Sequence, residues 1–161
     1  MEFQPIGVIR TPHKAPEEMP VQPVGATGVS GRIELEPDLA EGLRDLDGFS
    51  HIIVLYCFHR TKDTALTVTP FLGRKPHGIF ATRAPVRPNP IGLSILKLTG
   101  IDDAVLSVEN VDMLDGTPVL DIKPYVPAFD LPVGKVRTGW FAEKPGAVRG
   151  ARSDRRFTFE G

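Results

Sequence analysis

The stretch His51-Ile-Ile-Val-Leu-Tyr-Cys-Phe58 does most to set the fold class of this chain. It is almost continuously apolar and predicts a strand that is buried on both faces. Around it, apolar and polar residues alternate with a period of two, which is typical of strands with one buried face. We predict strands at residues 6–9, 32–35, 51–58, 78–82, 94–101, 105–113 and 119–125.

A single short helix is predicted at Pro37–Leu46, where leucines recur at four- and three-residue spacing behind an acidic first turn. Residues 12–24 and 61–76 are predicted to be long loops, and long loops in compact domains are often functional. Many short strands without crossover helices must protect their edges. The sequence therefore predicts an all-β domain, built as a closed or nearly closed barrel.

The composition is that of one soluble globular domain of 161 residues, with 41% hydrophobic and 24% charged residues. Sixteen prolines and sixteen glycines, spread along the chain, favour turns over long helices. A single cysteine fits a reducing, cytoplasmic compartment, and no apolar run approaches the roughly 18 residues of a membrane span. We expect a folded domain at residues 1–142. A basic tail is expected at 143–161, flexible or docked as a strand through Phe157 and Phe159.

The net charge of −1 hides a segregation of charges along the chain. Residues 64–101 contain no Asp or Glu, residues 102–121 contain no Lys or Arg, and the tail is basic again. A local positive patch of this kind could bind phosphates. The alternative is that these charges only solvate opposite faces of a sheet.

The segment Phe80–Ser94 combines three prolines, two arginines, an asparagine and a glycine. Proline fixes its own φ and biases its predecessor toward extended geometry, so Arg87-Pro-Asn-Pro90 cannot be helical. Such a stiff connection holds polar groups in a fixed arrangement, as a small-molecule site requires. A turn stiffened only for stability is the competing interpretation.

Several common catalytic sites are absent from the sequence. There is no Walker loop, no dinucleotide fingerprint and no nucleophile elbow. The histidines lack the spacing of a metal cluster, so we expect no metal. Cys57 is interpreted as a core residue, and Trp140 as a side chain that closes the edge of the core.

Four segments resemble the TsaA/TrmO family of S-adenosylmethionine-dependent tRNA methyltransferases: Gln4–Pro12, Phe49–His59, Gly78–Ser94 and Leu114–Tyr125. They occur in the family's order within residues 3 to 130. The resemblance implies a single-sheeted β-barrel that works as a homodimer, with the cofactor S-adenosyl-L-methionine bound near the subunit boundary. It also implies methyl transfer to N6 of threonylcarbamoyladenosine at tRNA position 37.

The resemblance also implies a set of cofactor contacts. Arg83 could hold the donor's carboxylate, acidic groups could bind its ribose or face its cation, and Phe58 and Leu93 could contact its adenine. Core packing is the competing role for Phe58 and Leu93. The full set is Gln22, Pro23, Val24, Phe58, His59, Arg83, Leu93, Glu109, Asn110, Val111 and Asp112.

Substrate contacts are expected from two further groups. Arg87 and Asn89 could hold the threonyl carboxylate or a phosphate. Asp121, Lys123 and Tyr125 share one face of a strand, which makes them candidates for moving the proton. No single residue can be assigned as the catalytic base.

The resemblance is to a short form of the family, because longer members add a C-terminal domain and this chain ends about twenty residues after Trp140. The basic tail could replace some of that domain's phosphate contacts to tRNA. Two alternatives stay open. One is a methyltransferase of the same fold that acts on a different RNA or a small molecule, and the other is a non-catalytic S-adenosylmethionine-binding module.

Overall fold

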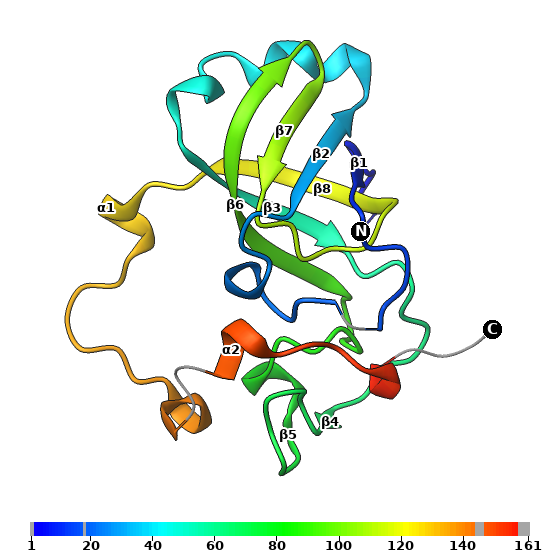
Figure 1. Ribbon diagram of the computed structural model, residues 1–161, viewed down its shortest axis with the longest axis vertical. Helices are drawn as coiled ribbons and strands as arrows, with labels where there is room; N and C mark the ends of the chain where they lie inside the picture. The colour runs from blue at the N-terminus through cyan, green and yellow to red at the C-terminus, as the bar shows by residue number, and fades with distance from the viewer. Residues whose placement is uncertain (1, 18, 144–146, 158–161) are drawn as a thin grey trace.

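Six antiparallel strands close into a barrel in the computed structural model, which describes residues 2–17, 19–143 and 147–157. Around the barrel their order is β1-β2-β7-β6-β3-β8, and Figure 1 shows them in the upper half of the molecule. The strands are β1 (Gly7–Arg10), β2 (Ser30–Leu35), β3 (His51–Cys57), β6 (Ile91–Asp102), β7 (Val105–Glu109) and β8 (Thr117–Pro124). The predicted all-β barrel is confirmed.

The core fills the inside of the barrel, and alternate residues of each strand point into it. In β3, Ile52, Val54 and Tyr56 are buried, whereas the outward residues, including Cys57, are only half-buried. The sequence-based predictions that this strand is buried on both faces and that Cys57 is a core residue are therefore wrong. In a closed barrel only one face of a strand meets the core, so the outward apolar residues form a second, exposed surface.

Residues 59–90 form a second lobe below the barrel (Figure 1). It contains only the short pair β4 (Thr67–Val68) and β5 (His77–Gly78), and it packs around a small apolar cluster with Val68, Ile79 and Val86. The strand predicted at residues 78–82 is wrong: after Gly78 the chain makes a 3₁₀ turn at Ile79–Ala81. The Thr82 hydroxyl donates a 2.9 Å hydrogen bond to the Ile79 carbonyl and so closes this turn locally.

Two 3₁₀ helices, Pro37–Leu43 and Leu46–Gly48, replace the helix predicted at residues 37–46. The chain leaves helical geometry between them, where Asp45 has a φ of 66°. The strand predicted at 105–113 also ends early, because Asn110 has a φ of 68° and turns the chain at the end of β7. Both predictions missed a residue in the left-handed region, which breaks a regular element.

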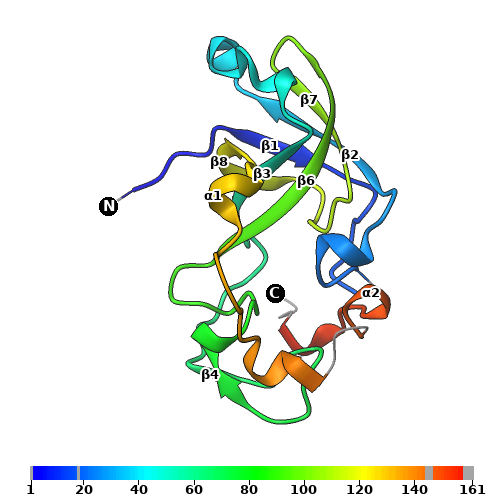
Figure 2. The same ribbon diagram turned by 90° about the vertical axis from the view of Figure 1, so that its left-hand side faces the viewer.

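After β8 and the short helix α1 (Pro127–Asp130), the chain crosses from the barrel to the second lobe (Figures 1 and 2). We call residues 131–139 the arm, and every residue in it is exposed. Beyond the arm lies the helical turn α2 (Ala147–Gly150), followed by a single bridge between Arg152 and Pro20. No helix in the described parts of the chain is long and apolar enough to cross a membrane.

The described part of the tail docks on the second lobe. Phe157 is buried and makes an edge-to-face contact with Phe71, with ring centroids 4.9 Å apart. It lies in a 3₁₀ turn, Arg155–Phe157, rather than in the docked strand considered above. Phe159, the other residue of that predicted strand, lies outside the described residues.

Candidate functional site

A cavity of about 590 Å³ lies between the barrel and the second lobe, within the usual size range of small-molecule sites. It forms because β7 pairs only with Lys97–Asp102 of β6, so that the first half of β6 is bordered by loops instead of a strand on that side. The barrel wall includes Tyr56, Phe58, Ser94 and Asp112, and the second-lobe wall includes Phe71, Arg83, Trp140 and Phe141.

Asp112 reaches the cavity because the chain turns sharply after β7. The Asn110 side-chain oxygen accepts a 3.0 Å hydrogen bond from the Gly28 backbone N–H and so fixes the turn. Val111 is then buried in the barrel core. The Ser94 hydroxyl donates a 2.7 Å hydrogen bond to Asp112 Oδ1, so the carboxylate is held against the start of β6.

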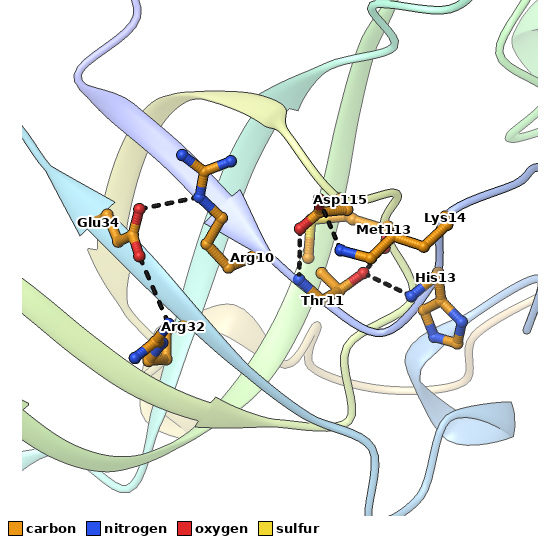
Figure 3. Close-up of polar contacts among 8 residues, drawn as sticks. All are labelled: Arg10, Thr11, His13, Lys14, Arg32, Glu34, Met113 and Asp115. Carbon is orange, nitrogen blue, oxygen red and sulfur yellow. Dashed lines mark hydrogen bonds and ion pairs between the residues drawn. The ribbon is translucent and has the colours of Figure 1, made fainter.

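The far end of the same loop is anchored to the end of β1, as Figure 3 shows. The Thr11 hydroxyl donates to the Met113 carbonyl over 3.0 Å, and the Thr11 N–H donates to Asp115 Oδ1 over 3.1 Å. Lys14 pairs with Asp115 at 2.8 Å and, together with Thr11, lowers the pKa of this carboxyl group. The loop that carries Asp112 is therefore fixed at both ends.

A row of polar groups runs from the barrel interior to the cavity. Tyr56 Oη lies 3.3 Å from the Ser94 hydroxyl, and burial raises the pKa of Tyr56 so that it stays a neutral phenol. Burial also raises the pKa of Asp112 to about 6, although the Ser94 hydrogen bond favours the carboxylate. Asp112 therefore changes its charge within the range from pH 5 to 7.

Glycine at position 92 makes room for this row. A Cβ atom there would lie 2.3 Å from ring carbons of Tyr56, which is far inside the van der Waals distance. Gly92 faces the Tyr56 ring directly, because the two residues pair across β3 and β6. The glycine at position 92, within the segment Gly78–Ser94, thus has a steric role. It lets the buried phenol of Tyr56 lie flat against the strand.

Arg83 comes from the stiff loop and lies against the 3₁₀ turn Pro23–Gly25. Its Nη1 donates a 2.7 Å hydrogen bond to the side-chain oxygen of Gln22. No ion pair holds Arg83 within the described parts of the chain, so its charge is available to an anionic group in the cavity. Phe58 packs edge-to-face on Tyr56 at 5.3 Å. Burial and then Arg60 lower the pKa of His59, so its ring is neutral at pH 7.

Arg87 keeps the stiff loop in shape. Its Nη1 donates to the carbonyl oxygens of Ile79 at 3.2 Å, Thr82 at 2.9 Å and Ala84 at 3.5 Å. These carbonyls flank Arg83, so the Arg87 guanidinium positions the segment that carries Arg83. The hydrogen bonds of this half-buried cation add to the prolines as a reason for the rigidity predicted for the segment.

The cavity brings together most of the residues predicted for the cofactor: Gln22, Pro23, Val24, Phe58, His59, Arg83, Leu93 and Asp112. Glu109, Asn110 and Val111 do not line it. Glu109 points outward and pairs with Lys97 at 2.9 Å, Asn110 forms the turn, and Val111 is a core residue. The contacts themselves stay predictions.

The residues predicted for the substrate lie elsewhere. Asp121 and Lys123 do share one face of β8, but they form a 2.6 Å ion pair on the outside of the barrel. Tyr125 follows the end of β8, and Asn89 is exposed beside the start of β6. None of these residues, nor Arg87, lines the cavity.

Among the cavity residues that sequence reasoning missed, four matter most here: Tyr56, Ser94, Trp140 and Phe141. Tyr56 and Ser94 are the inward residues of β3 and β6, and the alternation of each strand could have identified their orientation. Trp140 and Phe141 have no comparable signal, because their place depends on the path of the arm. No cluster of metal-ligating side chains is present in the described residues.

This chain belongs to the family of the tRNA-methyltransferase O N-terminal domain, whose profile matches residues 8–131. The match includes the barrel from Val8 in β1 to the end of β8, and all of the second lobe at residues 59–90.

Individual relatives are similar over most of this chain. It is 47% identical over 155 residues to a probable S-adenosyl-L-methionine-binding protein of Pyrococcus abyssi, which covers 96% of this chain and 84% of the relative. It is 40% identical to the tRNA (adenine(37)-N6)-methyltransferase of Escherichia coli, over 78% of this chain and 58% of that enzyme. The crystal structure of TrmO from Pseudomonas aeruginosa superposes with a TM-score of 0.73 at 38% identity, over 87% of this chain and 62% of the other.

Proposed function

We propose that this protein is an S-adenosylmethionine-dependent methyltransferase that methylates N6 of an adenine in tRNA, at position 37. The observation that carries the proposal is the placement of Arg83 and Asp112 in one cavity, in a chain that is 40% identical to an enzyme of that name. The finer substrate that we propose is adenosine already carrying a threonylcarbamoyl group.

The cavity fits the methyl donor in size and chemistry. S-adenosylmethionine supplies a methyl group on a sulfonium cation, together with an amino acid end, a ribose and an adenine. Arg83 is suited to the carboxylate by charge-assisted hydrogen bonds, with Gln22 holding the guanidinium in place. Asp112, held by Ser94, is suited to ribose hydroxyls or to a cationic group. Phe58 offers an apolar surface beside them.

The protein's part in the transfer is positioning. Much of the rate advantage in such a displacement comes from holding nucleophile and methyl carbon in near-attack geometry. A fixed Asp112 loop and a stiff Arg83 loop, from two different lobes, serve that purpose. The walls are mostly apolar, so ligands that fill the cavity would displace water and strengthen each polar contact inside.

We further propose a homodimer, based on an apolar surface that the fold leaves open. On the outside of β6, Ile91, Leu93 and Ile95 are 39%, 44% and 37% exposed, and they adjoin the half-buried outer residues of β3. The arm adds exposed Val133 and Val136. A second copy of the chain would bury this surface, as an isologous interface does. Because Leu93 also lines the cavity, the interface would adjoin the site.

The proposed dimer is tested by changing Ile91, which lies outside the cavity, to Lys. We expect the variant to be monomeric by light scattering, and an unchanged oligomeric state would remove this interface. As an enzyme of tRNA, the protein is proposed to act in the cytoplasm.

The proposed function is tested by two measurements on the full chain. Calorimetry should show S-adenosylmethionine binding that Arg83→Ala weakens at least tenfold, with Arg83→Lys intermediate and the melting temperature almost unchanged. Incubation with unmethylated tRNA, followed by mass spectrometry of nucleosides, should show a new N6-methyl group at threonylcarbamoyladenosine. If the protein binds S-adenosylmethionine but methylates no RNA, it is a donor-binding module and not an RNA methyltransferase. If it does not bind S-adenosylmethionine, the proposal is contradicted.

A further inference from the structure

Three aromatic rings form a stack on the second-lobe wall of the cavity. The rings of His77 and Trp140 are nearly parallel, at 14° with centroids 4.6 Å apart, and those of Trp140 and Phe141 are at 25° and 4.0 Å. The indole N–H of Trp140 donates a 2.9 Å hydrogen bond to the Ala81 carbonyl, which fixes the ring's orientation. We call Trp140 and Phe141 the aromatic shelf, because they line the cavity and His77 does not.

The aromatic shelf directly follows the arm. Every residue of the arm is exposed, and the chain returns to the second lobe at Trp140 and Phe141. Both rings are half-buried and face the cavity rather than the apolar cluster of the lobe. They also lie beyond residues 8–131, the part of the chain that the family profile matches. The sequence-based interpretation of Trp140 as closing the core edge therefore accounts for only part of its position.

The charged residues of the cavity narrow the class of ligand that would bind at the aromatic shelf. Arg60 and Arg83 line the same cavity, and neither is paired with a carboxylate in the described residues. The sequence from 64 to 101, which forms most of the second lobe, has no acidic residue. An aromatic face and unpaired cations within one site are the combination that binds unpaired bases and their flanking phosphates in single-stranded RNA. A purely apolar ligand would not require the cations.

We infer that the outer face of Phe141, which is backed by Trp140 and His77, is the binding surface for the unpaired purine base of the RNA acceptor, with Arg60 available to a flanking phosphate. This inference rests on the proposed function, and it assigns the acceptor to the aromatic shelf while Asp112 on the barrel wall and Arg83 in the stiff loop hold the donor. A base that is to be modified must leave its stack, and an aromatic face replaces part of the lost stacking energy. The shelf provides such a face next to the donor contacts.

Trp140 is the only tryptophan of the chain and stacks on Phe141, so its fluorescence reports on changes at the shelf. The probe is an anticodon stem-loop RNA, added in the presence of S-adenosylhomocysteine so that no reaction occurs. We expect saturable quenching of the emission by the intact RNA. The matched control RNA has an abasic nucleotide at the acceptor position, and it should bind through its phosphates with little quenching.

Variants give a second readout. Phe141→Ala should raise KM for the RNA by about 5- to 100-fold, the range expected for the loss of one stacked base, with donor affinity within twofold of wild type. Trp140→Phe keeps a ring behind Phe141 and loses the hydrogen bond to Ala81, so it should stay within about threefold. Should Phe141→Ala fold poorly, Phe141→Leu tests the same surface with an apolar replacement of similar size.

The inference is overturned if intact and abasic RNA quench equally, or if the variants methylate RNA with unchanged KM. A failure of the proposed function gives a different result. The wild-type protein would then transfer no methyl group to RNA, whereas the comparison of intact with abasic RNA would still show whether a base stacks on the aromatic shelf.

Discussion

The two walls of the cavity are built in opposite ways. The barrel wall is fixed by strand register: Tyr56, Ser94 and Gly92 take their places because β3 and β6 pair residue by residue around a core from which water is excluded. The second-lobe wall has only two strands of two residues each, a small apolar cluster and the hydrogen bonds of Arg87. One wall is set by many backbone hydrogen bonds, and the other by a few side chains.

This difference assigns different tasks to the two lobes. A barrel wall with a full core holds the polar row from Tyr56 to Asp112 without rearrangement. A lobe with few buried contacts opens locally at a lower free-energy cost than the barrel. We therefore expect the second lobe to move when ligands enter and leave the cavity, while the barrel wall stays in place. Four substitutions can break or sharpen this contrast.

Gly92→Ala should have the largest effect, because the new methyl group would collide with the buried Tyr56 ring at 2.3 Å. Overpacking of this kind typically costs about 1–3 kcal/mol, and we expect the upper end of that range in the free energy of unfolding. The matched control is Gly78→Ala in the second lobe, where no atom lies within 4 Å of the added Cβ. Chemical denaturation of both variants measures the difference. Equal stabilities would show that the barrel wall is not rigid.

Arg87→Ala should destabilise the second lobe by about 2 kcal/mol, since three backbone carbonyls lose a charged donor. Hydrogen exchange should accelerate in residues 79–90 and stay unchanged in β3 and β6. Donor affinity should also fall, although Arg87 does not line the cavity. If Arg87 instead contacts substrate directly, affinity for RNA will fall while exchange in the loop remains slow.

Asp112→Asn should remove the pH dependence of donor affinity. Burial raises the pKa of Asp112 to about 6, so the unliganded site gains its negative charge as the pH rises from 5 to 7. Affinity for the cationic donor should therefore rise about tenfold over that interval in the wild type and stay flat in the variant. His59 and Arg83 line the same cavity as Asp112, and the Asn variant controls for both. A persistent pH dependence would point to His59.

The raised pKa of Asp112 also affects the stability of the unliganded protein. Here a rise in pH lowers the stability, whereas it raises the affinity for the donor. The folded-state pKa of Asp112 lies above the ordinary Asp value of 3.8, so the folded protein binds the proton more tightly than the unfolded chain. This contribution is present below about pH 4 and is lost as the pH rises toward 6. Thermal melts of wild type and Asp112→Asn across this range should converge at low pH.

Glu109→Gln should have the smallest effect. Its ion pair with Lys97 is on the outer surface, where such pairs contribute about 0.2–1 kcal/mol. Donor affinity measured by calorimetry should be unchanged. A tenfold loss would instead show that Glu109 binds the donor as the resemblance predicted, and that the outward ion pair is broken in the complex.

Local patterns predicted the fold class better than the element boundaries. Period-two alternation found the strands around β3, because alternation is a direct consequence of one face meeting the core, and a continuous apolar run found β3 itself. The end of the strand at 105–113 and the helix at 37–46 were wrong where Asn110 and Asp45 adopt left-handed geometry, and the strand at 78–82 was wrong because the chain makes a 3₁₀ turn there. Such a conformation is stabilised by contacts far along the chain, here from Asn110 to Gly28.

By itself, the sequence determined an all-β barrel, a stiff arginine-bearing loop and the family to which the chain belongs, since all three depend on residues adjacent in the chain. Only the tertiary structure decided which polar residues share the cavity. It placed Asp112 against Ser94 and turned Glu109 and Asp121 outward, and it brought Trp140 to the same cavity through the arm. The physical reason is that the direction in which a side chain points from a closed sheet depends on strand register and on the path of the loops. Both are fixed by partners that are distant in sequence.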